Sequence, residues 1–359
     1  MKKIKRQIYK YLPYLKPLSL ILIGILLFFL LRLLAPSIYK LVEATIQGPK
    51  LAYSLLAADT SSLNSSNNRT NILILGVSGG NNLGNDLTDT MIFMSLDKSN
   101  ADTVMLSIPR DIWLDSMQAK INTAYHYGEE NSIGKGFALA KDAVYEVFNQ
   151  PIHYAVLIDF EGFIKIIDLL EGLDIKIDKS FDDFKYPISG KEEDDCDGDL
   201  DYKCRYEHLH FDAGVNHMDG ETALMFVRSR NAKGDEGTDF ARSQRQQKVI
   251  LALKDKIFSL KLLFNPKKIG EIKKTLGEHV KFDTQFTQEQ TTAFLSLLLR
   301  FIRNGNSIRT IALDFGDEEN LGFLFNPPIE EYGQWVLAPR AGDWSEVHKY
   351  VEDKIFKGY

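Results

Sequence analysis

The sequence predicts an α/β protein, a three-layer α-β-α domain with a central mixed sheet, preceded by one N-terminal transmembrane helix. Short apolar runs typical of buried strands alternate along the chain with amphipathic segments of helical length. Strands interleaved with helices in this way fold as a sheet covered on both faces. Ahead of these segments, a long apolar stretch follows a basic N-terminus, which is the pattern of a membrane anchor.

The first 38 residues predict a signal-anchor. Residues 1–16 contain six Lys or Arg and no acidic residue, and the next fifteen residues carry no charge. That is short for a span of about 20 residues, but Lys16 and Arg32 can snorkel and the apolar stretch continues to residue 38. A cleaved secretory signal is disfavoured by the long basic lead and by the lack of a small-x-small cleavage site. We therefore expect a cytoplasmic tail at 1–16, a membrane helix at 17–38 and an extracytoplasmic remainder.

The rest of the chain reads as a Ser/Asn-rich linker followed by one folded domain. Residues 39–70 are expected to be a juxtamembrane segment and linker, and the domain is expected to span 71–359. Apolar runs predict strands, and a period near 3.6 residues predicts helices. The predicted strands are 71–77, 90–96, 103–108, 154–158, 173–177 and 310–313. The predicted helices are 136–148, 160–170, 221–229, 240–260, 289–301 and one from about residue 344.

Residues 179–212 form an acidic insertion that contains the only two cysteines, Cys196 and Cys204. In an extracytoplasmic chain a local disulfide is the leading interpretation. His208 and His210 lie nearby, so a Cys/His metal site stays open as an alternative, although the spacing matches no familiar zinc pattern. Alternating aspartates at 195–201 resemble part of a calcium loop but lack its terminal glutamate. We expect an acidic hairpin closed by a disulfide.

Four arginines fall within eighteen residues of a chain whose formal net charge is −6: Arg228, Arg230, Arg242 and Arg245. The guanidinium group matches phosphate oxygens bidentately. A local cluster in an acidic chain predicts a site for one anion and argues against a nucleic-acid surface.

The second arginine pair lies on a predicted helix that begins near Asp239. Arg242, Arg245 and Gln246 stand at i, i+3 and i+4, so we expect them to share one face near the helix N-terminus, where free backbone N–H groups also favour anions. The alternative is an exposed helix whose arginines pair with the acidic residues that precede it.

Further polar residues follow the predicted strands. Asp86 and Asp89 stand just before the strand at 90–96, and such carboxylates suit Mg²⁺, although turns favour Asp for their own hydrogen bonds. Arg110 and Asp111 follow the proline that ends the strand at 103–108, and Lys120 comes soon after. In open α/β sheets this edge is where ligands bind.

Taken together, these motifs resemble the LytR–CpsA–Psr (LCP) family of bacterial cell-envelope enzymes. The segments that carry the resemblance are LTDT (87–90), SIPRD (107–111), KINTAY (120–125), FVRSR (226–230) and DFARSQRQQ (239–247). It is close over residues 68–265. It implies a membrane-anchored phosphotransferase that moves a glycan from a polyprenyl-pyrophosphate carrier to a peptidoglycan hydroxyl through a phosphodiester, with Mg²⁺ or Mn²⁺ and an apolar tunnel for the lipid. The implied partners are this carrier, peptidoglycan and the bilayer, with no nucleic acid.

The resemblance also implies roles for individual residues. Asp89 matches the metal-binding aspartate, and Asp111 and Asp239 match acidic positions of the motifs. Because the acceptor hydroxyl needs a base, Asp111 and Asp239 are our candidates for it, and Arg110 is the third residue expected to act in catalysis. The residues expected at the pyrophosphate are Arg110, Lys120, Arg228, Arg230, Arg242, Arg245 and Gln246.

The chain departs from the family pattern at Ser78, where members often carry Asp, and at Leu87, where they often carry Arg. Asp86 is our candidate for the missing metal-binding carboxylate. Two alternatives to the transferase remain: a non-catalytic regulator that binds polyprenyl lipid or wall glycan, and a lipid pyrophosphatase in which water replaces the glycan acceptor.

Overall fold

The structure is a computed structural model of the chain. It describes residues 59–80, 84–100, 102–188, 190–191, 194–237, 239–257, 266–304, 308–313 and 321–357. The predicted cytoplasmic tail and membrane helix, and the juxtamembrane segment up to residue 58, lie outside the described residues. Among the helices that are described, none is both long enough and apolar enough to cross a membrane.

A six-stranded mixed sheet forms the centre of the protein, as predicted. Its strands run in the order β11-β6-β1-β2-β3-β12, with β1 parallel to β6 and β3 parallel to β12, whereas β2 is antiparallel to both of its neighbours. The carboxyl ends of β1, β3, β6 and β12 therefore meet at one edge, together with the start of β2. The strands are β1 (Arg69–Val77), β2 (Thr88–Asp97), β3 (Thr103–Ser107), β6 (Tyr154–Asp159), β11 (Val280–Phe282) and β12 (Ile308–Ala312).

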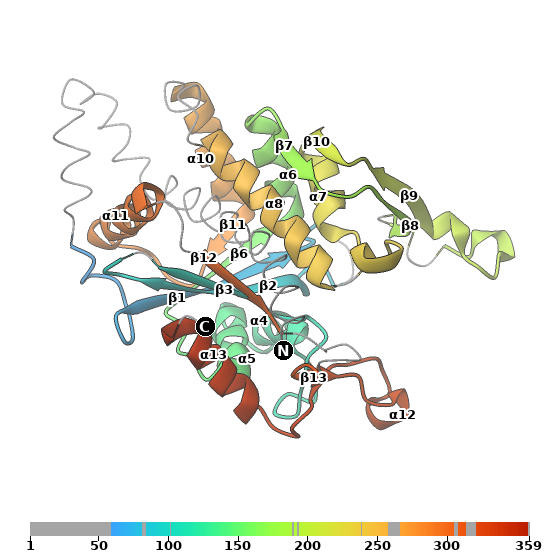
Figure 1. The fold of residues 1–359 in the computed structure, drawn as a ribbon, viewed down its shortest axis with the longest axis horizontal. Helices are drawn as coiled ribbons and strands as arrows, with labels where there is room; N and C mark the ends of the chain where they lie inside the picture. The colour runs from blue at the N-terminus through green and yellow to red at the C-terminus, as the bar shows by residue number, and fades with distance from the viewer. Residues whose placement is uncertain are drawn as a thin grey trace, which may run out of the picture.

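Helices cover both faces of this sheet (Figure 1). One face carries α6 (Phe160–Leu169), α7 (Gly220–Arg228), α8 (Asp239–Ile257), α10 (Pro266–His279) and α11 (Gln288–Asn304). The other carries α4 (Ala124–Asn131), α5 (Gly136–Phe148) and α13 (Ser345–Phe356).

Strand alternation divides the core into two halves. Along β1, Ile72 and Ile74 pack in the cluster with α6, α7 and α8, whereas Leu73 and Leu75 pack in the cluster with α5 and α13. Successive side chains of a strand point to opposite faces, so a strand that is buried on both faces is apolar throughout. This explains why the run at 71–77 shows no polar alternation.

Shorter paired strands build the periphery. β7 (Leu173–Ile177) pairs with β10 (Gly214–Met218), β8 (Phe181–Pro187) with β9 (Tyr206–Phe211), β4 (Trp113–Leu114) with β5 (Ala119–Lys120), and β13 (Leu324–Phe325) with β14 (Ala338–Pro339), which follows α12 (Ile329–Tyr332).

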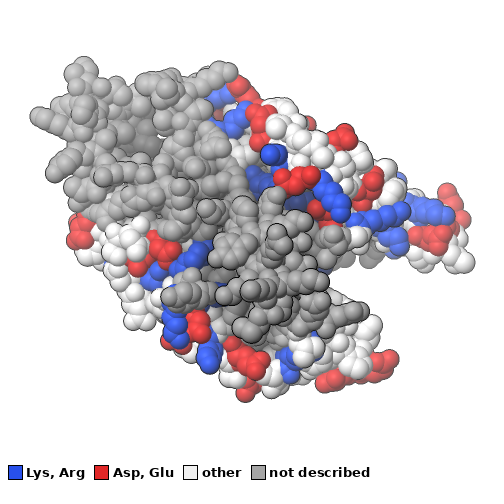
Figure 2. Space-filling view, viewed as in Figure 1, with Lys and Arg blue, Asp and Glu red and all other residues white. Residues whose placement is uncertain are grey.

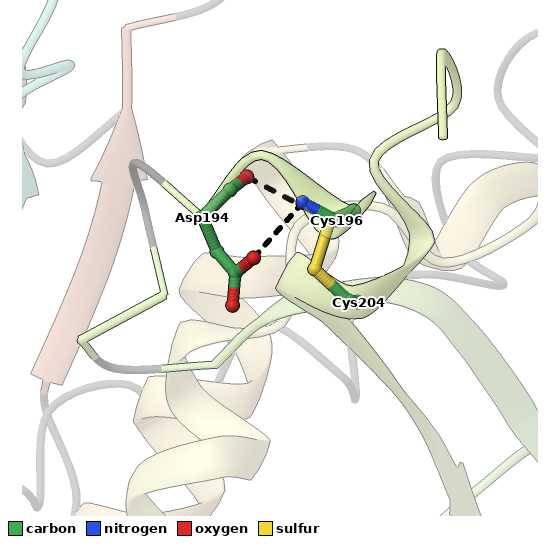
Figure 3. A group of neighbouring side chains, drawn as sticks. All are labelled: Asp194, Cys196 and Cys204. Carbon is green, nitrogen blue, oxygen red and sulfur yellow. Dashed lines mark hydrogen bonds between the residues drawn. A yellow bond between two sulfur atoms is a disulfide. The ribbon is translucent and has the colours of Figure 1, made fainter. Parts of the chain in front are cut away.

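The β8–β9 hairpin is the acidic insertion predicted from the sequence. It extends away from the sheet in Figure 1, and short 3-10 turns, η3 (Cys196–Gly198) and η4 (Lys203–Arg205), form its tip. Cys196 and Cys204 are joined there by a disulfide with a Cα–Cα distance of 5.5 Å (Figure 3). The Asp194 carboxylate accepts a hydrogen bond of 2.9 Å from the Cys196 N–H. Because the two sulfur atoms are bonded to each other, they offer no thiolate for a metal.

The predicted linker differs from expectation at its C-terminal end. Leu63 is buried in the core, and the Asn64 N–H donates to the Tyr154 hydroxyl at 2.8 Å. These contacts help to fix a segment whose Ser/Asn composition favours turns.

His153, just before β6, should make stability depend on pH. Its Nδ1 accepts from the Asn71 N–H at 2.9 Å, and its Nε2 lies 3.0 Å from the Ser66 hydroxyl. Burial lowers the pKa of His153 from 6.5 to about 4, so the neutral ring stabilises the fold above pH 6.5. That contribution, about 1–2 kcal/mol once the partial solvent exposure of the ring is allowed for, is lost as the pH falls from 6.5 to 4.

The substitution His153→Asn keeps an acceptor for the Asn71 N–H but cannot titrate. We expect wild type to lose more unfolding free energy than H153N between pH 7 and pH 4.5 in urea titrations followed by circular dichroism. Parallel pH curves for the two proteins would contradict this assignment.

Candidate active site

The carboxyl edge of the sheet carries two adjoining cavities of about 450 and 710 Å³. Asp89 enters from the start of β2 and Arg110 from the loop after β3, while Arg228 comes from the end of α7. All three residues line both cavities. Segments far apart in the sequence therefore meet at the edge where β2 begins, β3 ends and α7 ends.

Asp111 is the buried carboxylate that organises the cations here. Its side chain is 10% exposed, and its Oδ1 accepts from Lys120 Nζ at 2.9 Å. Its Oδ2 lies 3.5 Å from Arg110 Nε and 3.6 Å from Arg230 Nη2. With three cations around its two oxygens, Asp111 is a positioning residue for those cations, and the geometry does not favour it as a free proton acceptor.

Asp89 and Arg110 form the second ion pair of the site. Arg110 Nη1 donates to Asp89 Oδ1, and both side chains keep nearly a third of their surface exposed. Arg110 is thereby held from both sides, by Asp89 and by Asp111, with its guanidinium at the cavity wall. Fixing a guanidinium in this way reduces the entropy lost when it binds an anion.

Arg228 and Arg230 are held by the β8–β9 hairpin. The Asp183 carboxylate, fully buried in β8, accepts from the Ser229 hydroxyl at 2.7 Å and from the Arg230 N–H at 3.1 Å. The Arg228 guanidinium lies 4.7 Å from the centre of the Phe160 ring and 3.4 Å from the Tyr186 hydroxyl. Burial raises the pKa of Tyr186, so its phenol stays neutral beside the arginine.

Helix α8 turns its polar residues in two directions. Arg242 and Gln246 line the smaller cavity, whereas Arg245 is buried at 2% exposure. Its guanidinium donates to three carbonyls, those of Phe226 at 3.1 Å, Ser229 at 2.6 Å and Glu236 at 2.8 Å. Burial lowers its pKa to about 10, so it remains charged. We expected Arg245 to contact the anion; in the structure it instead fixes the turn between α7 and α8.

Helical geometry explains this split. Successive residues are rotated by about 100°, so Gln246 lies about 40° from Arg242 on one side and Arg245 about 60° on the other. Residues at i, i+3 and i+4 therefore span a broad face of the helix. Where α8 packs against α7, Arg245 is buried, whereas Arg242 and Gln246 face the cavity.

The remaining candidates have varied positions. The Asp86 carboxylate accepts from His126 Nδ1 at 2.9 Å and lines neither cavity, so its role as a metal ligand stays a prediction. Lys120 lines the larger cavity, as does Ser78. Asp239 is the first residue of α8, and its side chain lies outside what is described.

The two histidines of the insertion do not join the cysteines. His208 Nε2 and His210 Nδ1 both lie within 2.8 Å of Asp182 Oδ1 on the paired strand. The Asp182 hydrogen bond raises the pKa of His210. The open alternative of a Cys/His metal site therefore has no support in the structure.

A small apolar cavity of about 70 Å³ continues from the arginines into the core. It lies between Ile74, Ile92 and Ile158 of the sheet and the helices α6, α7 and α8. Arg228 and Gln246 line this cavity as well as the smaller anion cavity. A charged compartment thus adjoins an apolar one.

Sequence reasoning missed Asp183, Phe160, Tyr186 and Trp335 at this site. Asp183 and Tyr186 belong to a stretch interpreted only as an acidic insertion, and their strand pairing gave no local signal. Trp335 lines the smaller cavity from the segment before β14, more than eighty residues after the last motif.

Charges on the described surface are mixed. In Figure 2, Lys and Arg side chains are interspersed with Asp and Glu over the face that is drawn.

The fold and the site define a mixed α/β protein whose arginines line a polar cavity that adjoins an apolar one. Residues 38–324 match the LytR_cpsA_psr family, and the chain belongs to this family, as its motifs predict.

Two relatives and one solved structure illustrate the similarity. The chain is 32% identical over 248 residues, 68% of its length, to the polyisoprenyl-teichoic acid–peptidoglycan teichoic acid transferase TagU of Oceanobacillus iheyensis. It is 29% identical over 277 residues, 75% of its length, to the corresponding transferase TagV of Bacillus subtilis. These alignments cover 66% and 60% of the relatives, less than two thirds of either. The crystal structure of B. subtilis TagV superposes with a TM-score of 0.53 at 24% identity, covering 81% of this chain and 98% of that one, and so shares its fold.

Replacing Arg245 should destabilise the protein. Arg245→Leu leaves the buried carbonyls of Phe226 and Ser229, and the partly buried carbonyl and carboxylate of Glu236, without their donor. We expect it to lower the free energy of unfolding by about 3 kcal/mol.

Arg242→Leu, one turn earlier on the same helix, is the matched control, with an expected loss below about 1 kcal/mol. Urea unfolding of both variants measures the difference. Equal losses would show that Arg245 has no special structural role.

Proposed function

We propose that the protein is a membrane-anchored phosphotransferase that transfers a glycan polymer from a polyprenyl-pyrophosphate carrier to a peptidoglycan hydroxyl. The acceptor oxygen attacks the phosphorus that bears the glycan, and the bridging P–O bond to the second phosphorus breaks. A phosphodiester forms, polyprenyl phosphate leaves, and the hydroxyl proton passes to a base. The TagU and TagV relatives carry names of this type of reaction.

The observation that carries the proposal is the junction at Arg228 and Gln246, which line the polar and the apolar cavities together. A polyprenyl pyrophosphate has the same division, with a charged group covalently joined to a hydrocarbon tail. The tail is far longer than a cavity of about 70 Å³ allows. This cavity therefore holds only the part of the tail next to the pyrophosphate.

We assign the main catalytic role to the cationic side chains, which position the phosphoryl group and neutralise its charge. This reaction depends on positioning and on neutralising charge at the phosphoryl oxygens. Arg110 is fixed between Asp89 and Asp111, and Arg230 and Lys120 contact the same Asp111 carboxylate. Donors held in place before the substrate arrives need no reorganisation in the transition state.

The residues at the cavity also fit a divalent cation. Mg²⁺ uses one or two protein carboxylates, with phosphate oxygens and water completing its shell. The Asp89 carboxylate and the Ser78 hydroxyl line the larger cavity together, and both are hard oxygen ligands. We propose that they hold Mg²⁺ or Mn²⁺, which would neutralise charge on the pyrophosphate.

Asp239 remains our proposed base for the acceptor hydroxyl. It begins α8, three residues before Arg242, which lines the smaller cavity. The other acidic candidate, Asp111, already has three cationic neighbours.

Removing Arg110 should abolish transfer. In the full chain in detergent with Mg²⁺, we expect Arg110→Ala to lower kcat/KM for a glycan-bearing polyprenyl pyrophosphate by at least about 100-fold. Asp89→Asn should lower it and weaken the dependence on Mg²⁺ concentration. Lys274→Ala, an exposed change on α10, is the control and should leave the rate unchanged.

The products of the same assay separate the proposal from its alternatives. A glycan joined to peptidoglycan by a phosphodiester supports the ligase, whereas free glycan phosphate would indicate a pyrophosphatase. Tight binding of the carrier without turnover would indicate a regulator. Either of the last two results overturns the proposed reaction.

The proposed location is the cell membrane, with residues 1–16 in the cytoplasm and the α/β domain outside. Protease added to intact cells stripped of wall should degrade the domain and spare a tag at residue 1. A chain released to the medium by cleavage after residue 38 would contradict the anchor.

A further inference from the structure

Trp335 is an exposed aromatic side chain at the mouth of the smaller cavity. It is 41% exposed and lines this cavity together with Arg110, Arg230 and Arg242. Residue 335 lies beyond the stretch that matches the family, which ends at 324. The chain therefore completes its site with a residue that the family match does not cover.

The backbone that carries Trp335 is held firmly against the site. The Leu337 N–H donates to the Asp111 carbonyl at 2.9 Å, and the Leu337 carbonyl accepts from the Trp113 N–H at 2.9 Å. The Asn326 side chain donates to the Val336 carbonyl at 2.7 Å, and Val336 and Leu337 are buried. The position of the indole is therefore fixed through Asp111, the residue whose carboxylate also holds the cations.

The apolar cavity and Trp335 stand in different relations to the smaller anion cavity. The apolar cavity shares Arg228 and Gln246 with the smaller anion cavity, and Trp335 lines the anion cavity but not the apolar one. The indole therefore lies on the polar side of the junction, in the cavity of the arginines and away from the apolar cavity. In a lipid-linked glycan the order is hydrocarbon, pyrophosphate, sugar.

We propose that Trp335 is a stacking platform for the pyranose ring next to the pyrophosphate; this inference rests on the proposed function. The C–H face of a pyranose is apolar and positively polarised, which matches the negative face of an indole. A large rigid side chain on a fixed backbone loses little entropy on contact. Gln334 lines the larger cavity beside it and Asn231 the smaller one, and both offer amides for sugar hydroxyls.

The test compares two ligands on the full chain in detergent. One is a polyprenyl pyrophosphate that bears a disaccharide, and the other is the same lipid pyrophosphate without sugar. We expect Trp335→Ala to weaken binding of the first by roughly tenfold and to leave binding of the second unchanged. Trp335→Phe, which keeps an aromatic face, should recover part of the loss.

Ile329→Ala is the matched control, because Ile329 is 53% exposed in the same segment and lines neither cavity. Thermal unfolding verifies that each variant is folded. Unchanged affinity of Trp335→Ala for the sugar-bearing ligand overturns the proposal. An equal loss with both ligands also overturns it, since that result places the indole on the lipid or the pyrophosphate.

The outcomes for the platform and for the reaction are separable. A wild-type protein that shows no transfer but whose sugar-dependent binding falls with Trp335→Ala refutes the proposed reaction and supports the platform. A wild type that transfers glycan, with Trp335→Ala equal to it in binding and in KM, refutes the platform alone.

Discussion

The site depends on one buried carboxylate. Three cations repel one another at the carboxyl edge of the sheet, and Asp111 holds Arg110, Lys120 and Arg230 within 3.6 Å. A buried charge is tolerated when partners surround it, and here they are the groups offered to the anion. The backbone of Asp111 also binds Leu337, so the same residue joins the sheet edge to the C-terminal segment.

The second arginine pair shows how fold and site share one helix. Arg245 is directed into the protein and fixes the carbonyls of the turn after α7, while Arg242 and Gln246 face the cavity. Asp183 acts on the same turn from the opposite side through the Ser229 hydroxyl and the Arg230 N–H. Two buried charges of opposite sign thus stabilise the short connection that presents Arg228 and Arg230, and its geometry is determined before any ligand binds.

The sequence predicted five of the six central strands and most of the long helices because their signals are local, but it did not predict β11 or α10. The apolar run at 71–77 is β1 within two residues, and the helix at 136–148 is α5. The position of a side chain could not be predicted where it depends on packing between segments that are distant in the sequence. The direction of Arg245 is decided by packing against α7, and the burial of Leu63 by a core that distant strands assemble. Tyr186 reaches the cavity because β8 pairs with β9, and Trp335 because its loop is hydrogen-bonded to distant segments. Neither arrangement produces a recognisable sequence motif.

The strands and the tip of the β8–β9 hairpin face different demands. Tyr186 and Pro187, at the end of β8 that leads into the tip, line both cavities, whereas none of the described tip residues between Cys196 and Cys204 does. The disulfide closes the tip on itself, so a change of length or charge inside that loop need not alter the strand register below. The sequence of the hairpin tip can therefore change without affecting the residues that line the cavities. Homologous chains would then differ most at the tip, even where they act on the same substrate.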